Sequence, residues 1–563
     1  MNALRPYQIA ALGASKKKLA EGIKRQLLVL PTGTGKTVVF ANLPTHHGFT
    51  KRVMVLVHRE ELAQQAADKI ARWNPGYMVG VEMANSVSTP MDKVVVASVP
   101  TIGRLGNRRI EKFSPEEFDC LVCDEAHHST ANSYRNVFQH FGLLKIGDET
   151  FVPGESAPLL LGVTATPNRS DGTGLGEIYD DIVYDMPMLL AIRQGWLADI
   201  CGVRVNTSTN LDSVKTRMGD FAVDQLADTV NNPERNYLIV QGWMKQAYQR
   251  PTVAFTANIQ HALDLAKMFQ SAGVKAEAVW GDDPDRREKL RKHRAGEITV
   301  LANCNVLTEG YDDWRIGCII LARPTKSQLL FTQMAGRGTR IPDGVNNLHE
   351  AQAAGIVCEK TDCILMDVVD ATYRHSLVTT SLLFGMGANL DLEGKSASMA
   401  AGKLEAYAKQ YPFTDFSHLT AISNLEEFAK KVDLFQVTYS AEVKDNSQFR
   451  WRSVGDEYLL TVGREDSVRI AKDLRDVYQI VGTVNGVVLD CSAHDLATAF
   501  SLADHLIIHY GAAKTLLMRE AKWHADSPSP KQLALCRKLR IPVPATATKG
   551  DCAKALDNFF ARR

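Results

Sequence analysis

Residues 31–37 have the composition of a loop that wraps a phosphate group. The run reads Pro31, Thr32, Gly33, Thr34, Gly35, Lys36 and Thr37, and it lies between an apolar stretch and a helical one. Glycines let backbone N–H groups turn inward around an anion at the positive end of a helix dipole. Lys36 is expected to reach the outer phosphates of a nucleotide, and the Thr37 hydroxyl to ligate Mg²⁺. Leu30 or Pro31 stands where the strict form of this loop has its first glycine.

Two adjacent carboxylates supply the other half of such a site. Asp124 and Glu125 directly follow the apolar run Cys120–Cys123. A carboxylate at the end of a neighbouring parallel strand can reach the Mg²⁺ shell, which is the role we expect for Asp124. Glu125 is then placed to orient and deprotonate an attacking water. An acidic surface turn is the alternative, and a position directly after a buried strand argues against it.

Short apolar runs that alternate with helix-length segments must position these residues. Runs of this kind, rich in Val and Leu, are typical of parallel strands buried on both faces. We therefore predict an α/β fold with two tandem parallel-sheet domains, at residues 1–195 and 196–375. The predicted strands are Leu27–Leu30, Val53–Val57, Val94–Ala97, Leu121–Cys123, Leu159–Val163, Thr252–Phe255, Val300–Ala302, Cys318–Leu321 and Ile364–Val368.

The chain changes character after these domains. We predict a helical connector at 376–430, a small α+β module at 431–525 and a basic helix–loop–helix segment at 526–563. Asn485 and Gly486 form a good tight hairpin turn within the module. Phe449 and Trp451 alternate with arginines there, and the period of two favours burial of both rings over stacking on nucleic acid bases.

The last segment has a positive charge of its own. Residues 528–563 carry eight Lys or Arg and two Asp. Two helices separated by Pro542 and Pro544 resemble small SAP-like DNA-binding appendages. A helical hairpin docked on the rest of the protein explains the pattern equally well.

Composition excludes several classes of protein. The 563 residues include 65 Lys and Arg against 64 Asp and Glu, so net charge indicates no polyanionic partner. No apolar run reaches the ~20 residues that span a bilayer, and no signal peptide is apparent. The ten cysteines form no disulfide framework or zinc quartet. We expect an intracellular, cytoplasmic protein of a bacterium or phage, with no membrane partner.

Seven motifs in order resemble those of superfamily 2 helicases of the D-E-A-H group. The likeness is strongest to the bacterial RadD and XPB-like helicases, including phage relatives, and it covers residues 1–375. A cysteine-rich stretch that RadD has after this region is missing. The motifs are Leu4–Gln8, Pro31–Thr37, Val57–Leu62, Asp124–His127, Thr164–Pro167, Leu307–Asp312 and Gln333–Arg340.

The resemblance implies two RecA-like domains that bind ATP and Mg²⁺ between them. It assigns adenine recognition to Gln8, with Arg5 in the same segment, and ATP contacts to Gly310 and Asp312. Arg340 is implied as the arginine finger, with Arg337 beside it and Gln333 nearby. His127, Thr164 and Thr166 are implied to couple hydrolysis to movement. The implied nucleic-acid contacts are His58, Arg59, Ser98, Thr101, Thr256, Asn305, Thr308 and Glu309, although Pro100 replaces a glutamine that relatives often have.

The sequence therefore predicts an ATP-dependent helicase or translocase, with DNA the favoured track and a role in repair, recombination or replication. An RNA helicase is an alternative, since these cores grip mainly the sugar–phosphate backbone. Another is an ATP-gated clamp or recruitment subunit of a larger nucleic-acid-processing or defence complex. Its C-terminal modules would then bind protein partners.

Overall fold

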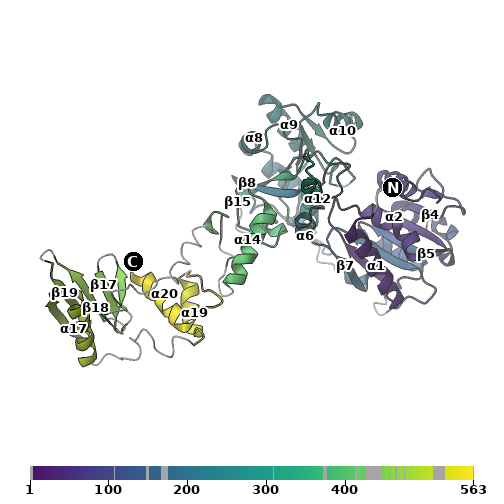
Figure 1. Cartoon of the computed structure of the whole chain (residues 1–563). Helices are drawn as coiled ribbons and strands as arrows, with labels where there is room; N and C mark the ends of the chain where they lie inside the picture. The colour runs from purple at the N-terminus through teal and green to yellow at the C-terminus, as the bar shows by residue number, and fades with distance from the viewer. Residues whose placement is uncertain are drawn as a thin grey trace. The chain divides into compact units, whose positions relative to one another are not determined.

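The computed structural model describes residues 4–106, 108–147, 151–166, 175–217, 219–308, 310–371, 377–411, 419–425, 457–462, 466–473, 476–510, 526–539 and 541–561, together with 416, 443, 446–447, 449 and 451–454. The chain divides into two compact units (Figure 1). The first comprises residues 1–402 and 420–422, and the second comprises 403–419 and 423–563.

The first unit begins with a parallel seven-stranded sheet. Its central strands are uniformly apolar because helices cover both faces. In sheet order the strands are β3 (Val79–Glu82), β4 (Val94–Ser98), β2 (Arg52–Val57), β5 (Phe118–Asp124), β6 (Leu159–Thr164), β1 (Arg25–Val29) and β7 (Asp181–Asp185).

Helices complete the core of this first domain. Side chains such as Phe138 and Phe118 form one buried cluster with the strand residues that point to the same face. The helices are α1 (Pro6–Ala20), α2 (Lys36–His47), α3 (Glu60–Trp73), α4 (Val99–Ile102), α5 (Asn132–His140) and α6 (Met188–Arg193), with short 3-10 turns η1 (Arg108–Lys112), η2 (Pro115–Glu117), η3 (Ala126–His128) and η4 (Leu175–Glu177).

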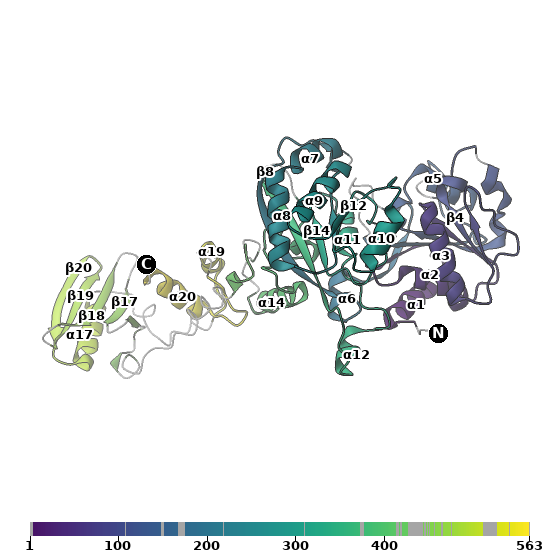
Figure 2. The ribbon, with the colours of Figure 1, turned by 90° about the horizontal axis from the view of Figure 1, so that it is seen from above.

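A second parallel sheet, of six strands, follows in the same unit. Helices α8 and α9 cover one face of it, where Trp243 and Phe269 are buried (Figure 2). The sheet order is β12 (Ala276–Val279), β13 (Val300–Asn303), β11 (Thr252–Phe255), β14 (Cys318–Leu321), β15 (Asp362–Ala371) and β8 (Asp199–Asn210).

The remaining elements of the second domain surround this sheet. A two-stranded hairpin, β9 with β10, stands between β8 and the first helix. The elements are β9 (Thr216–Arg217), β10 (Asp220–Phe221), α7 (Val223–Val230), α8 (Pro233–Gln246), α9 (Ile259–Ser271), α10 (Arg286–Arg294), α11 (Gln328–Ala335), α12 (Leu348–Ala353), α13 (Thr380–Leu383) and α14 (Ala397–Gln410), the last of which continues into the second unit.

The fold class predicted from the sequence is confirmed, and so are all nine predicted strands. In the two parallel sheets, the strands that the sequence did not indicate are β3, β7, β8 and β12, which are the four edge strands. Strand β8 is buried only at Ile200, Gly202 and Val205, and it is exposed at every second position from Asn206 to its end. It lies at the start of the predicted second domain, in a stretch where the sequence analysis predicted no strand.

The second unit contains a five-stranded antiparallel sheet with one helix on its face. The turn at Asn485 and Gly486 joins the last two strands with positive φ angles of 49° and 76°, as predicted. Phe449 and Trp451 are buried in this module, which confirms the core interpretation of both rings. The elements are β16 (Arg452–Val454), β17 (Glu457–Thr461), β18 (Ser467–Lys472), β19 (Tyr478–Val484), β20 (Val487–Ala493) and α17 (Leu496–His509).

Two further helices, α19 (Pro530–Lys538) and α20 (Lys549–Ala561), form the predicted helix–loop–helix. Ser529 caps the first helix by accepting a hydrogen bond from the backbone of Gln532. Cys536 and Cys552 lie in the small apolar cluster between the helices. Within the described part of the chain, no helix is both long and apolar enough to cross a bilayer.

Candidate nucleotide and nucleic-acid site

The phosphate-binding loop joins β1 to α2 through two glycines in left-handed conformations. The φ angles are 90° at Gly33 and 78° at Gly35, which side chains other than glycine rarely adopt. Close neighbours add a second requirement. A Cβ on Gly33 would lie 3.3 Å from the Arg340 Cγ, and one on Gly35 would lie 3.0 Å from the Gln8 Nε2. The loop therefore needs glycine at both positions.

Lys36 and Glu125 face each other at the carboxyl ends of β1 and β5. The Lys36 Nζ lies 3.0 Å from the Glu125 Oε1, and both side chains are largely buried. Glu125 has a φ of 49°, an unusual backbone conformation for this residue type. Backbone strain of this kind is typical of functional sites, where the surrounding structure holds the residue in place.

Asp124 lies beside Glu125 and can contribute to a cation site. Burial and the neighbouring Glu125 carboxylate raise the pKa of Asp124 to about 6. A cation would offset that cost, and the Thr37 hydroxyl lines the same cavity. Mg²⁺ takes most of its ligands from water and phosphate, so one carboxylate and one hydroxyl fit it. Among the described residues, no group of three or more His, Cys, Asp or Glu is arranged to hold a metal ion.

The second domain contributes Arg340 from the opposite wall. Its guanidinium forms an ion pair with Asp312, and burial lowers its pKa to about 10. Arg337 has a different environment. It donates hydrogen bonds to the carbonyl of Thr308, at 2.6 and 3.1 Å, and to the carbonyl of Tyr311 at 3.1 Å. In this structure Arg337 therefore braces the loop that contains Gly310, and Arg340 is the cation that approaches the phosphate loop.

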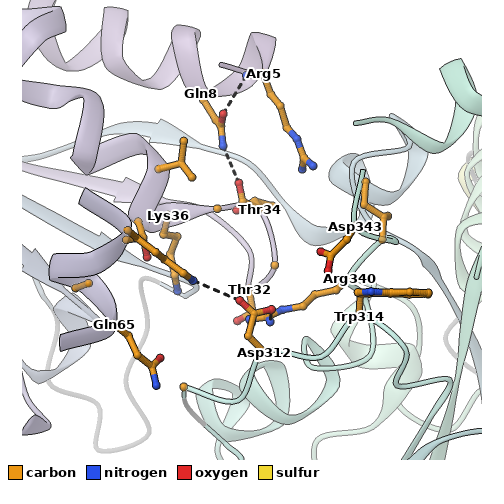
Figure 3. A pocket seen from close by; sticks show the side chains of 18 of the residues that line it. Arg5, Gln8, Thr32, Thr34, Lys36, Gln65, Asp312, Trp314, Arg340 and Asp343 are labelled. Atoms are coloured by element: carbon orange, nitrogen blue, oxygen red, sulfur yellow. Dashed lines mark hydrogen bonds and ion pairs between the residues drawn. The ribbon is translucent and has the colours of Figure 1, made fainter. Parts of the chain in front are cut away.

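Together these residues line a cavity of about 670 Å³ between the two α/β domains (Figure 3), a size ordinary for small-molecule sites. Gln8 is fixed at one end. Its Oε1 accepts from the Arg5 backbone at 2.9 Å, and its Nε2 donates to the Thr34 carbonyl at 3.1 Å. The Arg5 side chain also reaches across to Asn346 of the second domain, with 3.2 Å between Nε and Oδ1.

Several cavity residues were not found by the sequence analysis. Lys69 lines the cavity, and its Nζ lies 3.3 Å from the Asp312 Oδ2. It belongs to one face of α3, whose helical spacing could have indicated it. No sequence pattern indicates Trp314 or the loop 341–346, because they line the cavity only where the second domain packs against the first. The α3 residues in the lining are Leu62, Gln65, Ala66, Lys69 and Trp73.

The residues expected to couple hydrolysis to movement are not among the residues that line the cavity, and one of them contacts a carboxylate. The His127 Nδ1 lies 3.5 Å from the Glu125 Oε2. Thr164 ends β6 and Thr166 follows it, and the Thr164 hydroxyl donates to the Thr166 carbonyl at 2.9 Å. Gln333 is buried in α11.

The expected nucleic-acid contacts gather at the carboxyl ends of strands in both domains. Arg59 is exposed just beyond β2, whereas the Ser98 and Thr256 side chains are buried. His58 connects this edge to the carboxylates through a row of tilted rings, with ring centroids 4.3 Å apart between His58 and His128 and 4.2 Å apart between His128 and His127.

The other expected nucleic-acid contacts differ from one another in burial and in hydrogen-bond partners. Thr101 lies within α4 and is almost fully buried, while the Asn305 side chain accepts from Arg323 at 3.2 Å. Thr308 offers its carbonyl to Arg337. Glu309 lies outside the described residues.

Three family models match successive parts of the chain. Residues 2–169 match "Type III restriction enzyme, res subunit", and residues 235–342 match "Helicase conserved C-terminal domain". Residues 431–563 match "Mitochondrial helicase Irc3, C-terminal domain". That last match spans the α+β module and the helix–loop–helix, which the sequence analysis had separated.

Curated relatives are similar over the same core. The putative ATP-dependent helicase IRC3 of Saccharomyces cerevisiae is 34% identical, covering 64% of this chain and 53% of that protein. The putative mitochondrial ATP-dependent helicase irc3 of Schizosaccharomyces pombe is 33% identical, covering 68% and 60%. The DNA 3'-5' translocase XPB2 of Sulfurisphaera tokodaii is 24% identical, covering 60% and 79%. The chain thus spans little more than half the length of the two yeast relatives.

Proposed function

We propose that this chain, whose residues 2–342 form the two-domain core of a superfamily 2 helicase, hydrolyses ATP in order to move along DNA. One observation carries the proposal. A nucleotide-sized cavity has the phosphate loop and paired carboxylates on one wall and an arginine from a second α/β domain on the other. Such a site is complete only when the two domains meet.

Each cavity residue has a proposed task. Lys36 binds the outer phosphates, and Glu125 takes a proton from the attacking water. Thr37 and Asp124 would hold Mg²⁺, which neutralises phosphate charge when bound. Arg340 stabilises the charge that develops on the transferred phosphoryl group. Gln8 and Arg5 bind the adenine end, and Gly310 and Asp312 approach the nucleotide from the second domain.

Movement follows from the requirement for closure. The carboxyl ends of the strands of both domains carry the proposed nucleic-acid contacts, and the same ends carry the ATP residues. ATP binding draws the domains together, and release of products lets them part. A strand held by residues of both domains is then displaced in each cycle. His127, Thr164 and Thr166 are proposed to connect the two events, and Gln333 is proposed to act beside the arginine finger.

DNA is the proposed track because a similar protein is named a DNA translocase. A role in repair, recombination or replication belongs to the same proposal, as does the D-E-A-H assignment based on Asp124–His127. The C-terminal modules are proposed to bind nucleic acid or protein partners. An intracellular location in a bacterium or phage stays a prediction, whereas the two yeast relatives are eukaryotic and one is named mitochondrial.

Steady-state ATP hydrolysis tests the proposal. The full chain is assayed with titrated single-stranded DNA, duplex DNA, branched DNA and RNA at a stated salt concentration. Strong stimulation by one DNA form supports movement on that DNA, and a tailed fluorescent duplex then separates unwinding from translocation. Stimulation by RNA alone would identify the RNA-helicase alternative. A slow rate indifferent to all four would identify the ATP-gated clamp.

A further inference from the structure

The β9–β10 hairpin lies near the carboxyl ends of the strands of the second sheet, where the proposed nucleic-acid contacts of that domain also lie. A short segment, 211–215, leads to it from Asn210, the last residue of β8, and β8 is parallel to the other five strands. Its chain therefore emerges at the carboxyl edge of the sheet. None of the seven motifs includes this hairpin.

The base of the hairpin is packed on the domain. Leu211, Val214 and Phe221 are buried with residues of α7 in one apolar cluster. Ala257, two residues after the end of β11, belongs to the same cluster and is fully buried. The cluster fixes the hairpin beside Thr256, one of the proposed contacts.

A polar connection leads from the hairpin to a second proposed contact. The Asp220 carboxylate accepts from the Thr325 hydroxyl at 2.8 Å and from the Lys326 backbone at 2.9 Å. It also pairs with Arg323 at 3.4 Å, and Arg323 donates to the Asn305 side chain. The one carboxylate on the paired strands is thus already neutralised by its neighbours.

The outer part of the hairpin is cationic. Lys215, Thr216 and Arg217 are exposed. The Lys326 ammonium stands behind them, donating to the Thr216 hydroxyl at 2.6 Å and lying 5.0 Å from the centre of the Phe221 ring. Exposed cations on a rigid support, next to residues that meet a sugar–phosphate backbone, suit phosphate contacts.

We propose that this hairpin is an additional nucleic-acid contact of the second domain, in which Lys215 and Arg217 bind phosphates of the strand held across the core. The inference rests on the proposed function and names a surface for it. Because the hairpin is fastened to Asn305 and to the end of β11, it moves with the second domain and holds the strand in each closure.

A matched pair of double variants of the full chain tests the inference. Lys215→Ala/Arg217→Ala removes the two hairpin cations. Lys267→Ala/Lys275→Ala removes two exposed cations from α9 and from the start of β12, at the opposite edge of the same domain. The net charge change is identical, so any difference between the variants reflects position. Lys215→Arg/Arg217→Lys keeps both charges.

Binding of a fluorescein-labelled single strand, DNA and RNA in separate arms, is measured by polarisation over a range of salt. The hairpin variant should bind roughly tenfold more weakly than the wild type, and the slope of log affinity against log salt should fall by about 1.5. For the hairpin variant, the concentration of nucleic acid that gives half-maximal ATPase stimulation should rise by the same factor as the affinity falls. The control and charge-preserving variants should match the wild type.

Equal binding and equal salt slopes for the hairpin and control variants would overturn the inference. That result leaves the proposed function intact if the wild type is still stimulated by nucleic acid. A wild type that neither binds nor responds to nucleic acid overturns the proposed function as well. Thermal unfolding midpoints of all variants ensure that only folded proteins are compared.

Discussion

Thr32 of the phosphate loop and Gly336 of the second domain lie directly against each other. A Cβ placed on Gly336 would be 2.6 Å from the Thr32 Cβ, a distance that real carbon atoms do not adopt. The Thr339 hydroxyl is 3.5 Å from the Thr32 carbonyl in the same contact. The Thr32 side chain therefore packs directly on the backbone of Gly336, and the absence of a side chain at Gly336 lets the second domain, which carries Arg340, approach the phosphate loop this closely.

Gly336→Ala should lower ATP turnover by roughly a hundredfold, because the added methyl group holds the arginine finger away from its working position. Thr32→Gly removes the atom that the methyl group would strike, so the double variant should recover part of the loss. The measurement is kcat for the wild type, both single variants and the double variant. A double variant no better than Gly336→Ala would show that the contact does not control the domain approach.

Lys36→Ala and Glu125→Gln should each nearly abolish hydrolysis. Loss of Lys36 removes the cation expected at the outer phosphates, and Glu125→Gln removes the proton acceptor, which contributes about 10²–10⁴-fold. Glu116→Gln, on an exposed turn of the same domain, is the control and should leave the rate unchanged. Normal hydrolysis in either site variant would rule out the assigned roles.

Arg340 and Arg337 should respond differently to substitution, because one faces the cavity and the other braces a loop. Arg340→Ala is expected to lower kcat by about 10³-fold while leaving the unfolding midpoint near that of the wild type. Arg340→Lys should not restore the rate, since a lysine lacks the planar fork of donors. The measurements are kcat and thermal unfolding of each variant.

Arg337→Ala, unlike Arg340→Ala, should lower the free energy of unfolding by about 2 kcal/mol, because it leaves the buried Thr308 and Tyr311 carbonyls without their donor. Identical stability and kinetics for the two alanine variants would contradict the difference seen in the structure.

The core of the fold could be predicted because its strands are buried on both faces. Val53–Val57 and Val94–Ala97 are short, continuous apolar runs rich in valine, and this length and composition favour strands over helices. The edge strands of the two parallel sheets were not predicted, because partial exposure interrupts the apolar runs by which a buried strand is recognised. β8 is the clearest instance, with exposed positions along a twelve-residue strand.

The candidate site was predicted only where chemistry and spacing lie within one segment. The phosphate loop and Asp124-Glu125 are such segments. Trp314 and Asn346 line the cavity only because the second domain approaches the first, which no local pattern records. The hairpin cations Lys215 and Arg217 are a further case, because two charges in a loop gain meaning only from the sheet edge beside them.

Gln8 should determine the preference for adenine. Its amide is held by the Arg5 backbone and the Thr34 carbonyl, so it cannot rotate freely to suit another base. Gln8→Ala is expected to lower the ratio of kcat/KM for ATP to kcat/KM for GTP by about tenfold. A fixed amide distinguishes adenine from guanine by the hydrogen bonds that each base can form with it. The ratio is measured with both nucleotides under the same conditions. An unchanged ratio would place base recognition elsewhere in the cavity.

Asp367 provides a test of stability that is independent of catalysis. Its carboxyl is buried on β15 and accepts from the Thr380 backbone at 3.0 Å, yet burial raises its pKa from 3.8 to about 6. Because the folded pKa exceeds the unfolded one, the ionised carboxylate costs stability. The penalty is complete above the folded pKa and disappears as the pH falls below the unfolded value.

Asp367→Asn keeps the acceptor for Thr380 and removes the charge. It should stabilise the fold by about 3 kcal/mol at about pH 8, which corresponds to the full pKa difference. The gain should shrink to about 1.5 kcal/mol at about pH 5, where most folded molecules already carry the proton. The gain is measured by denaturant unfolding of the wild type and of Asp367→Asn at the two pH values. A gain that is the same at both, or a loss at the higher pH, would mean that burial does not hold the proton on Asp367.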